Sequence, residues 1–222
     1  MNEVIIRIQE SGTIAVEEYK DGVKSYKDIN PDSLLACINK SLLRGSISSG
    51  LLPKGCLSFS ARDDGGRDAY ILHPEIAADI SYFGTAYAGF PLPRLVFGFH
   101  ISQEGRVSSC RIGIIANDTI LKPDTKMYRY PLSNVSGFAL CTGNNTFPKC
   151  TSLHTLGSLP YHILAMPNNN DHFCPQNNKG QLEMRDLLEH LKDKPPEYYY
   201  SDVLIPCKST LGDFINGRDM IR

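Results

Sequence analysis

Two runs of alternating apolar residues, joined by a short turn, place the strongest constraint on the fold. Every second residue is apolar in the first run (Leu95, Phe97, Phe99, Ile101) and again in the second (Cys110, Ile112, Ile114). Residues 103–106 lie between the two runs and contain a glycine. A period of two is typical of strands that bury one face. The pattern therefore predicts an antiparallel hairpin in the middle of the chain.

Further elements surround this hairpin. Strands are predicted over 55–61 and 68–72, because an Asp-Asp-Gly-Gly turn separates them at 63–66. Before them, Asn30 is suited to cap a helix that starts at Pro31 and ends at Gly45. A helix followed by a four-stranded antiparallel meander indicates an α+β domain.

The two ends of the chain carry weaker patterns. Alternation over 4–8 and 14–18 predicts an N-terminal β-hairpin, which we assign to an extension, residues 1–28. The remaining residues, 29–222, form the predicted main domain. Within it, 90–93 is predicted as a proline-rich turn, 182–191 as an amphipathic helix and 198–205 as a late strand.

The segment 130–170 is almost free of charge. Lys149 is its only Asp, Glu, Lys or Arg, whereas the chain average of 21% charged residues would place about eight or nine there. The segment is also rich in Asn, Ser, Thr and Gly. Such a neutral, irregular stretch suits a functional surface, and a loop-rich packing layer is the alternative.

Net charge and cysteine content bear on which partners and which cellular compartment the protein has. A formal net charge of -1 argues against nucleic acid or an anionic membrane as partner. The N-terminus lacks the features of a signal peptide, and the seven cysteines are irregularly spaced. We therefore expect reduced thiols and a cytoplasmic location.

Three of the cysteines lie in or beside the charge-poor segment. Cys37, Cys56, Cys110 and Cys207 are expected to be small packed side chains. Cys141, Cys150 and Cys174 remain as reactive candidates. One alternative is a zinc site that also uses His154, His162 or His172, although no Cys-x-x-Cys pair is present. Another is a cysteine hydrolase in which His154 or His162 serves Cys141 as base.

The passage Tyr128–Asn144, YRYPLSNVSGFALCTGN, resembles the active-site stretch of ubiquitin-conjugating enzymes. In those enzymes His-Pro-Asn precedes a glycine and then the catalytic cysteine, and here Leu132-Ser133-Asn134 replaces that motif. The block 91–143 is most similar to the bacterial family D of the superfamily, which includes the B protein of the ParB-related, ThiF-related cassette. That family also has a late Leu-x-x-Phe segment, matched here by 211–214.

The resemblance implies a fold, an activity and partners. It implies a ubiquitin-conjugating-enzyme-like fold with a β-meander flanked by helices. It makes Cys141 the nucleophile that accepts a ubiquitin-like modifier as a thioester from a ThiF-like activating enzyme and passes it to an amine, and Asn134 the candidate oxyanion stabiliser. A JAB-type peptidase and a role in antiphage defence are typical neighbours of such proteins. The activating enzyme would use the ATP, so no cofactor is expected here.

The residues give this chemistry a physical basis and leave alternatives open. A thioester needs an accessible thiol, and a nearby carboxylate would raise the thiol pKa, so a charge-poor surround is favourable. A neutral amide such as that of Asn134 can stabilise an oxyanion. Asn134 can equally form a local Asx turn. The whole domain can also be a catalytically inactive module that only binds the modifier.

Overall fold

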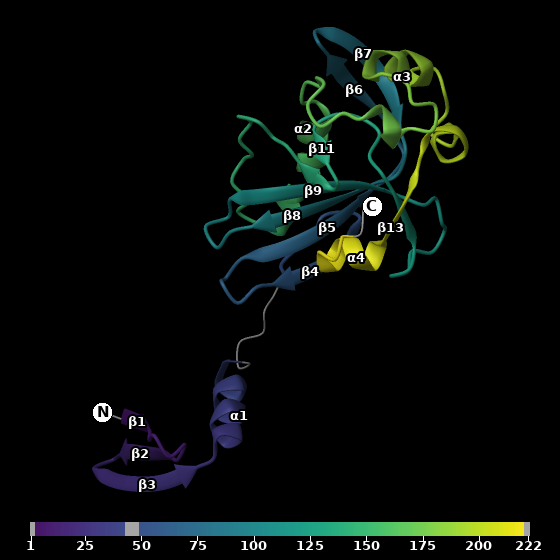
Figure 1. Ribbon diagram of the computed structural model, residues 1–222. Helices are drawn as coiled ribbons and strands as arrows, with labels where there is room; N and C mark the ends of the chain where they lie inside the picture. Colours follow the sequence, from purple (N-terminus) through teal and green to yellow (C-terminus); the bar gives the residue numbers. More distant parts are fainter. Residues whose placement is uncertain (1–2, 43–48, 220–222) are drawn as a thin grey trace. The chain divides into compact units, whose positions relative to one another are not determined.

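The computed structural model describes residues 3–42 and 49–219 (Figure 1). By their internal contacts the residues form two compact units, Met1–Ser48 and Ser49–Arg222. Each unit is described by itself. The division differs from the predicted boundary at residue 28, because helix α1 (Pro31–Leu42) groups with the N-terminal strands rather than with the larger unit.

The smaller unit holds a three-stranded antiparallel sheet in the order β1 (Glu3–Ile8), β2 (Ile14–Lys20), β3 (Val23–Ile29). The predicted hairpin is confirmed as β1 and β2, but the extension is not limited to two strands. Strand β3 was missed because its side chains are almost all exposed and show no apolar alternation. The turn itself carries the signal: Asp21 and Gly22 both have positive φ, 51° and 81°, as a two-residue hairpin loop requires.

Helix α1 begins as predicted. The Asn30 side-chain oxygen accepts a hydrogen bond from the backbone N–H of Ser33 at 2.7 Å, and Pro31 occupies the first helical position. Gly45, the predicted helix end, lies outside the described residues.

The larger unit is an α+β structure built on antiparallel strands. Its strands are β4 (Cys56–Ala61), β5 (Arg67–His73), β6 (Ile76–Tyr82), β7 (Thr85–Leu92), β8 (Leu95–Ile101), β9 (Val107–Ile115), β10 (Lys126–Tyr128), β11 (Val135–Ser136), β12 (Ala139–Leu140) and β13 (Pro206–Thr210). The main sheet has the order β11-β12-β9-β8-β5-β4, with β10 pairing β9 and β13. The predicted four antiparallel strands, β4, β5, β8 and β9, are thus confirmed.

The strands β6 and β7 are a correction, because 90–93 was predicted only as a turn. They follow β5 and precede β8 in the chain, and they pair with each other as a separate two-stranded sheet. Their connection is again a two-residue turn with positive φ, at Phe83 and Gly84. Pro91 fits within β7 because β6 is the only strand partner of β7 in the described chain, so an N–H on the other edge is not needed.

The helices of the larger unit are short. They are η1 (Leu153–Ser158), α2 (Leu159–Leu164), η2 (Pro175–Asn177), α3 (Met184–Leu191), the π-helical turn η3 (Tyr199–Val203) and α4 (Leu211–Asn216). Helix α3 confirms the prediction for 182–191. The predicted strand at 198–205 is wrong: the chain forms η3 there, and Tyr199 is fully buried with its hydroxyl donating to the Pro91 carbonyl at 2.9 Å. This tertiary anchor overrides the local β propensity of the three tyrosines at 198–200.

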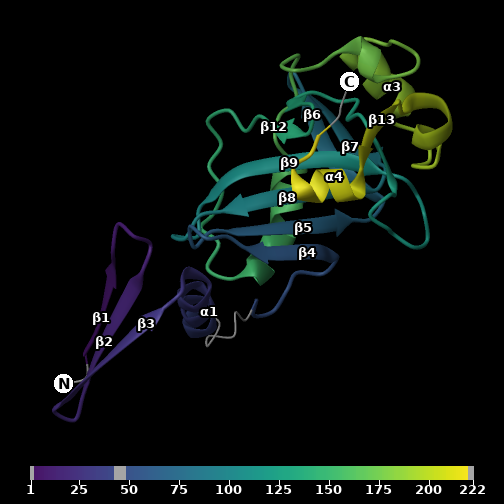
Figure 2. The ribbon, with the colours of Figure 1, turned by 60° about the horizontal axis from the view of Figure 1, so that its bottom comes forward.

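Both faces of the main sheet are covered, but unequally. One face packs into a large apolar cluster with η1, α2 and α3. The other face is covered by α4 (Figure 2). A smaller apolar cluster on this side includes Phe138 of the β11–β12 connection and Phe214 of α4. Within the described residues, none of the helices has the length and apolar character that a membrane span requires.

Burial of His73, at the end of β5, predicts a pH dependence of stability. Its Nδ1 lies 3.2 Å from the Pro74 carbonyl oxygen, and its Nε2 has no partner among the described residues. Burial lowers the pKa of this imidazole below its usual 6.5. Between these two pKa values the unfolded state binds more protons, so stability falls as the pH drops below about 6.5. We expect the melting temperature to fall from pH 7.5 to pH 5.5, and to fall less in His73→Phe, when both are followed by circular dichroism. Equal pH dependence in the two proteins would contradict the assignment.

Candidate functional site

Cys141 is presented by a small hairpin at the edge of the main sheet. Strands β11 and β12 form this hairpin, with Val135 opposite Leu140 and Ser136 opposite Ala139. Ala139 pairs with Arg111 of β9, and the N–H of Ile112 donates to the Phe138 carbonyl at 2.9 Å. Phe138, which is 1% exposed, anchors the turn in the core. Cys141 directly follows β12 and is exposed, so the sheet edge holds its backbone while solvent reaches the residue.

Asn134 is joined to Cys141 through the backbone. Its carbonyl accepts the N–H of Cys141 at 2.7 Å, and its own N–H donates to the Asp171 carbonyl at 2.8 Å. The residue has a φ of 64°, a conformation that Asn tolerates better than most residues. Its side-chain Nδ2 donates to the Pro167 carbonyl at 3.1 Å, which uses one of the two amide hydrogens. Asn134 therefore positions Cys141, and its role as an oxyanion stabiliser stays a prediction.

A groove of about 550 Å³ lies beside Cys141. The two residues that flank Cys141, Leu140 and Thr142, line this groove, and the rest of its wall comes from Ala139, from residues 106–110 and from the loop 145–149. Cys141 itself does not line it.

The other cysteines differ from Cys141 in exposure. Cys110 and Cys150 are buried, and burial raises the pKa of the Cys110 thiol. The Cys150 thiol donates to the Ser152 carbonyl at 3.0 Å. Cys174 is half-buried, with its sulfur 2.9 Å from the side-chain oxygen of Gln176. Burial also raises the pKa values of the half-buried Cys56 and Cys207.

Cys37 departs from its prediction as a packed side chain, because it is exposed on α1. The neighbouring Leu35, on the predicted apolar face of this helix, is also 57% exposed. Apolar periodicity identified the helix, but the contacts that would bury its apolar residues are tertiary.

The alternatives based on metal or histidine find no support in the geometry. Among the described residues, no group of three or more His, Cys, Asp or Glu side chains is arranged to hold a metal ion. His154 lies on η1 and His162 on α2, and both are exposed. No hydrogen bond described for the Cys141 thiol connects it to either histidine.

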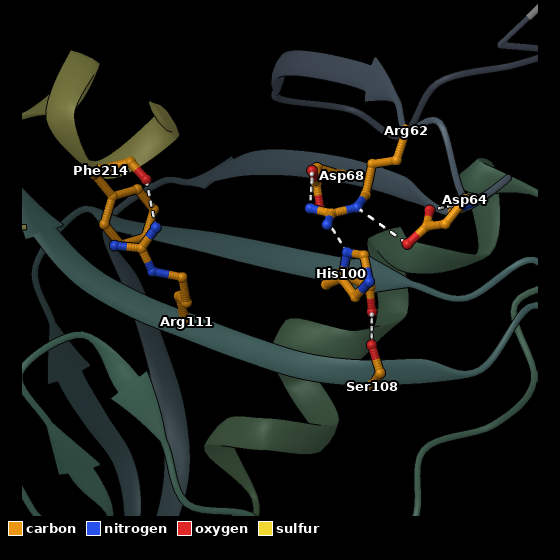
Figure 3. A network of polar contacts seen from close by, with 8 residues as sticks. Arg62, Asp64, Asp68, His100, Ser108, Arg111 and Phe214 are labelled. Carbon is orange, nitrogen blue, oxygen red and sulfur yellow. Dashed lines mark hydrogen bonds and ion pairs between the residues drawn. The ribbon is translucent and has the colours of Figure 1, made fainter. Parts of the chain in front are cut away.

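A polar cluster on the main sheet was not predicted from the sequence (Figure 3). Asp68 of β5 and His100 of β8 are directly opposite one another, and their side chains meet at 2.7 Å. Arg62 lies 3.4 Å from the same carboxylate. On the neighbouring strand, Arg111 donates to the Phe214 carbonyl at 2.6 Å and pairs with Asp219. Because protein carboxylates and a carbonyl already engage these cations, the cluster's evident role is to tie the turn at 62–66 and α4 to the sheet.

Selective alkylation follows from these differences in exposure. In the native protein at pH 7.5, we expect iodoacetamide to modify Cys37 and Cys141 before the other five cysteines, because these two are exposed whereas the others are buried or half-buried. Peptide mapping after a timed reaction would measure this order. In the Cys37→Ser variant, Cys141 should remain the fastest site. Faster labelling of Cys150 than of Cys141 would contradict the structure.

Comparisons of the chain with known protein families, with curated proteins and with solved structures found no match. The residues around Cys141 and the resemblance of the passage 128–144 are therefore the grounds on which a function is assigned.

Proposed function

We propose that this protein is a ubiquitin-conjugating-enzyme-like acyltransferase that carries a ubiquitin-like modifier as a thioester on Cys141. The observation that carries the proposal is an exposed cysteine at the end of a hairpin anchored on the sheet, whose backbone N–H donates a hydrogen bond to the Asn134 carbonyl. Apart from Lys149, the segment around it contains no Asp, Glu, Lys or Arg. An accessible thiol in neutral surroundings suits a nucleophile that must both accept and release an acyl group.

The reaction has two steps. The Cys141 thiol loses its proton, and the thiolate attacks the activated C-terminal carbonyl of the modifier. The sulfur–carbon bond forms, the bond between that carbonyl carbon and the leaving group of the activating enzyme breaks, and the leaving group takes up the proton that the thiol lost. An acceptor amine then attacks the thioester carbonyl, the sulfur–carbon bond breaks, and the proton lost by the amine balances the one regained by the thiol. In both steps negative charge develops on the carbonyl oxygen, and a donor such as the Asn134 amide would stabilise it.

The architecture is consistent with this proposal. The antiparallel strands β4, β5 and β8 precede the cysteine hairpin in the chain, in the order that the resemblance implies, whereas residues 103–130, which include β9, are an insertion relative to that family. We therefore propose a ubiquitin-conjugating-enzyme-like fold for the main domain, with the inserted pair β6–β7 as an addition. A ThiF-like activating enzyme and a ubiquitin-like modifier are the proposed partners, and a cytoplasmic location is the proposed compartment. We also propose a JAB-type peptidase as a further partner of this protein.

Intact-mass spectrometry under non-reducing conditions tests the proposal. The protein is incubated with a ubiquitin-like modifier, its ThiF-like activating enzyme and ATP. We expect an ATP-dependent adduct of modifier mass that reducing agent removes. If the activating enzyme becomes charged but no adduct forms, the protein is the alternative, a binding module that holds the modifier without chemistry.

A further inference from the structure

The edge of β9 that lies beside the cysteine hairpin is open over half its length. On one side β9 pairs with β8 from Val107 to Ile114. On the other side it pairs with β12 at Arg111 and with β10 at 114–115. Over 107–110, β8 is therefore the only strand partner within the described parts of the chain. Backbone groups on an unpaired edge are a template for another strand.

This open edge forms one wall of the groove beside Cys141. Residues 106–110 line the groove consecutively, and its other lining residues are Ala139, Leu140, Thr142, Asn145, Thr146, Phe147 and Lys149. Four residues of strand offer about 13 Å of edge, the length of a short extended peptide. A volume of about 550 Å³ lies in the range of ligand-binding clefts.

The far end of the groove is closed by a fixed backbone contact. The N–H of Cys150 donates to the Gly105 carbonyl at 2.7 Å, which ties the end of the 142–149 loop to the turn before β9. Gly105 has a φ of 83°, and a Cβ atom there would lie 2.5 Å from the Cys150 carbonyl oxygen. The 142–149 loop is thus held alongside the open edge of β9, and the groove lies between the loop and that edge.

The charged residues that line the groove are cations. Arg106 and Lys149 line it, and its other lining residues are neutral. Glu104 lies outside the groove. A hydrogen bond from Ser102 lowers the pKa of the Glu104 carboxyl most, and the charges of Arg106 and Lys149 lower it further. The three side chains leave one net positive charge at this end of the groove. An occupant with acidic side chains is therefore electrostatically favoured.

We propose that this groove binds the C-terminal tail of the modifier as an added strand on β9, and that this tail carries acidic residues before its terminal glycine. The inference rests on the proposed function, because it takes the acyl donor of Cys141 as the occupant. Backbone hydrogen bonds to the 107–110 edge hold the tail extended, and Arg106 and Lys149 select its charge. A tail in the groove passes alongside Leu140 and Thr142, the two residues that flank Cys141 in the chain.

Two synthetic hexapeptides test the inference. Both end in Gly-Gly, and one has glutamates where the other has lysines. Each is used as a fluorescein-labelled free acid, for binding by anisotropy, and as a mercaptoethanesulfonate thioester, for acylation followed by intact mass. We expect the glutamate peptide to bind and to acylate Cys141 at least about tenfold better than the lysine peptide. Replacing one peptide amide by an ester should weaken binding about fivefold.

Charge-reversal variants locate the binding site. Arg106→Glu/Lys149→Glu should invert the preference between the peptides. Lys54→Glu/Lys208→Glu, a matched reversal at exposed residues that do not line the groove, should leave the preference unchanged. Glu104→Gln should strengthen binding of the glutamate peptide.

The outcomes separate this inference from the proposed function. Selective binding without acylation of Cys141 would support the groove and overturn the proposed thioester chemistry. Equal binding and equal acylation by both peptides would keep Cys141 as nucleophile and overturn the groove. If neither peptide binds, the groove is not the tail site, whatever the acylation rates are.

Discussion

Replacing Cys141 with alanine is expected to abolish the modifier adduct, a loss of about a thousandfold or more in its rate of formation. The thiol is the only group of this residue that can form the covalent bond, and the buried Cys110 and Cys150 are not placed to substitute for it. The fold should tolerate the change, because Cys141 is exposed and its described hydrogen bond is made by the backbone N–H. Intact-mass spectrometry of the charging reaction measures the effect.

Cys141→Ser is the matched variant for this prediction. A serine hydroxyl retains a nucleophile of similar size, so we expect a slower adduct that survives reducing agent, since an ester replaces the thioester. Circular dichroism should give the same melting temperature for the wild type and both variants. An adduct that persists in Cys141→Ala would assign the chemistry to another thiol, and adding Cys37→Ala, Cys150→Ala or Cys174→Ala to that variant would identify which one.

Replacing Phe214 with alanine is expected to destabilise the larger unit by about 3–5 kcal/mol. Phe214 of α4 is fully buried, and its ring packs edge-to-face against Phe138 at 5.0 Å between centroids. It also contacts Tyr70 at 5.8 Å, and the Arg111 guanidinium lies 4.5 Å from its centroid. Truncation removes these contacts and leaves a cavity between α4 and the sheet. At about 2–4 °C per kcal/mol, the melting temperature should fall by about 10 °C.

Ile215→Ala is the control for this prediction. Ile215 lies on the same helix but is only partly buried, so its truncation should cost about 1 kcal/mol. Phe138 lies in the turn between β11 and β12, and Phe214 packs against it. Phe214→Ala should therefore loosen the hairpin that precedes Cys141 and reduce modifier charging at temperatures where the protein remains folded. A melting temperature within 2 °C of the wild type would mean that α4 is not an integral part of the core.

Local patterns were sufficient for the elements that bury one face. The alternation of Leu95, Phe97 and Phe99 predicted β8, and the apolar positions at 184–191 predicted α3, because burial of one face repeats with the period of the element. Strands β3 and β7 were missed since their apolar periodicity is weak, whereas β6 was missed although Ile76, Ile80 and Tyr82 alternate with polar or small residues. Their turns, at 21–22 and 83–84, were the available signal, and Asp21-Gly22 in particular has the composition of a hairpin loop.

Some features of the candidate site could likewise be predicted from local patterns, and others could not. The order of residues was enough to identify the charge-poor segment, the passage around Cys141 and therefore the candidate nucleophile. Three features became visible in the folded chain alone: Cys141 is exposed while Cys150 is buried, the Asn134 carbonyl holds the backbone of Cys141, and an open edge of β9 faces the loop 142–149. The physical reason is that exposure and strand pairing depend on residues far apart in the chain. A hydrophobic pattern reports which face of a strand is buried, whereas a strand's unpaired edge is set by where its partners end.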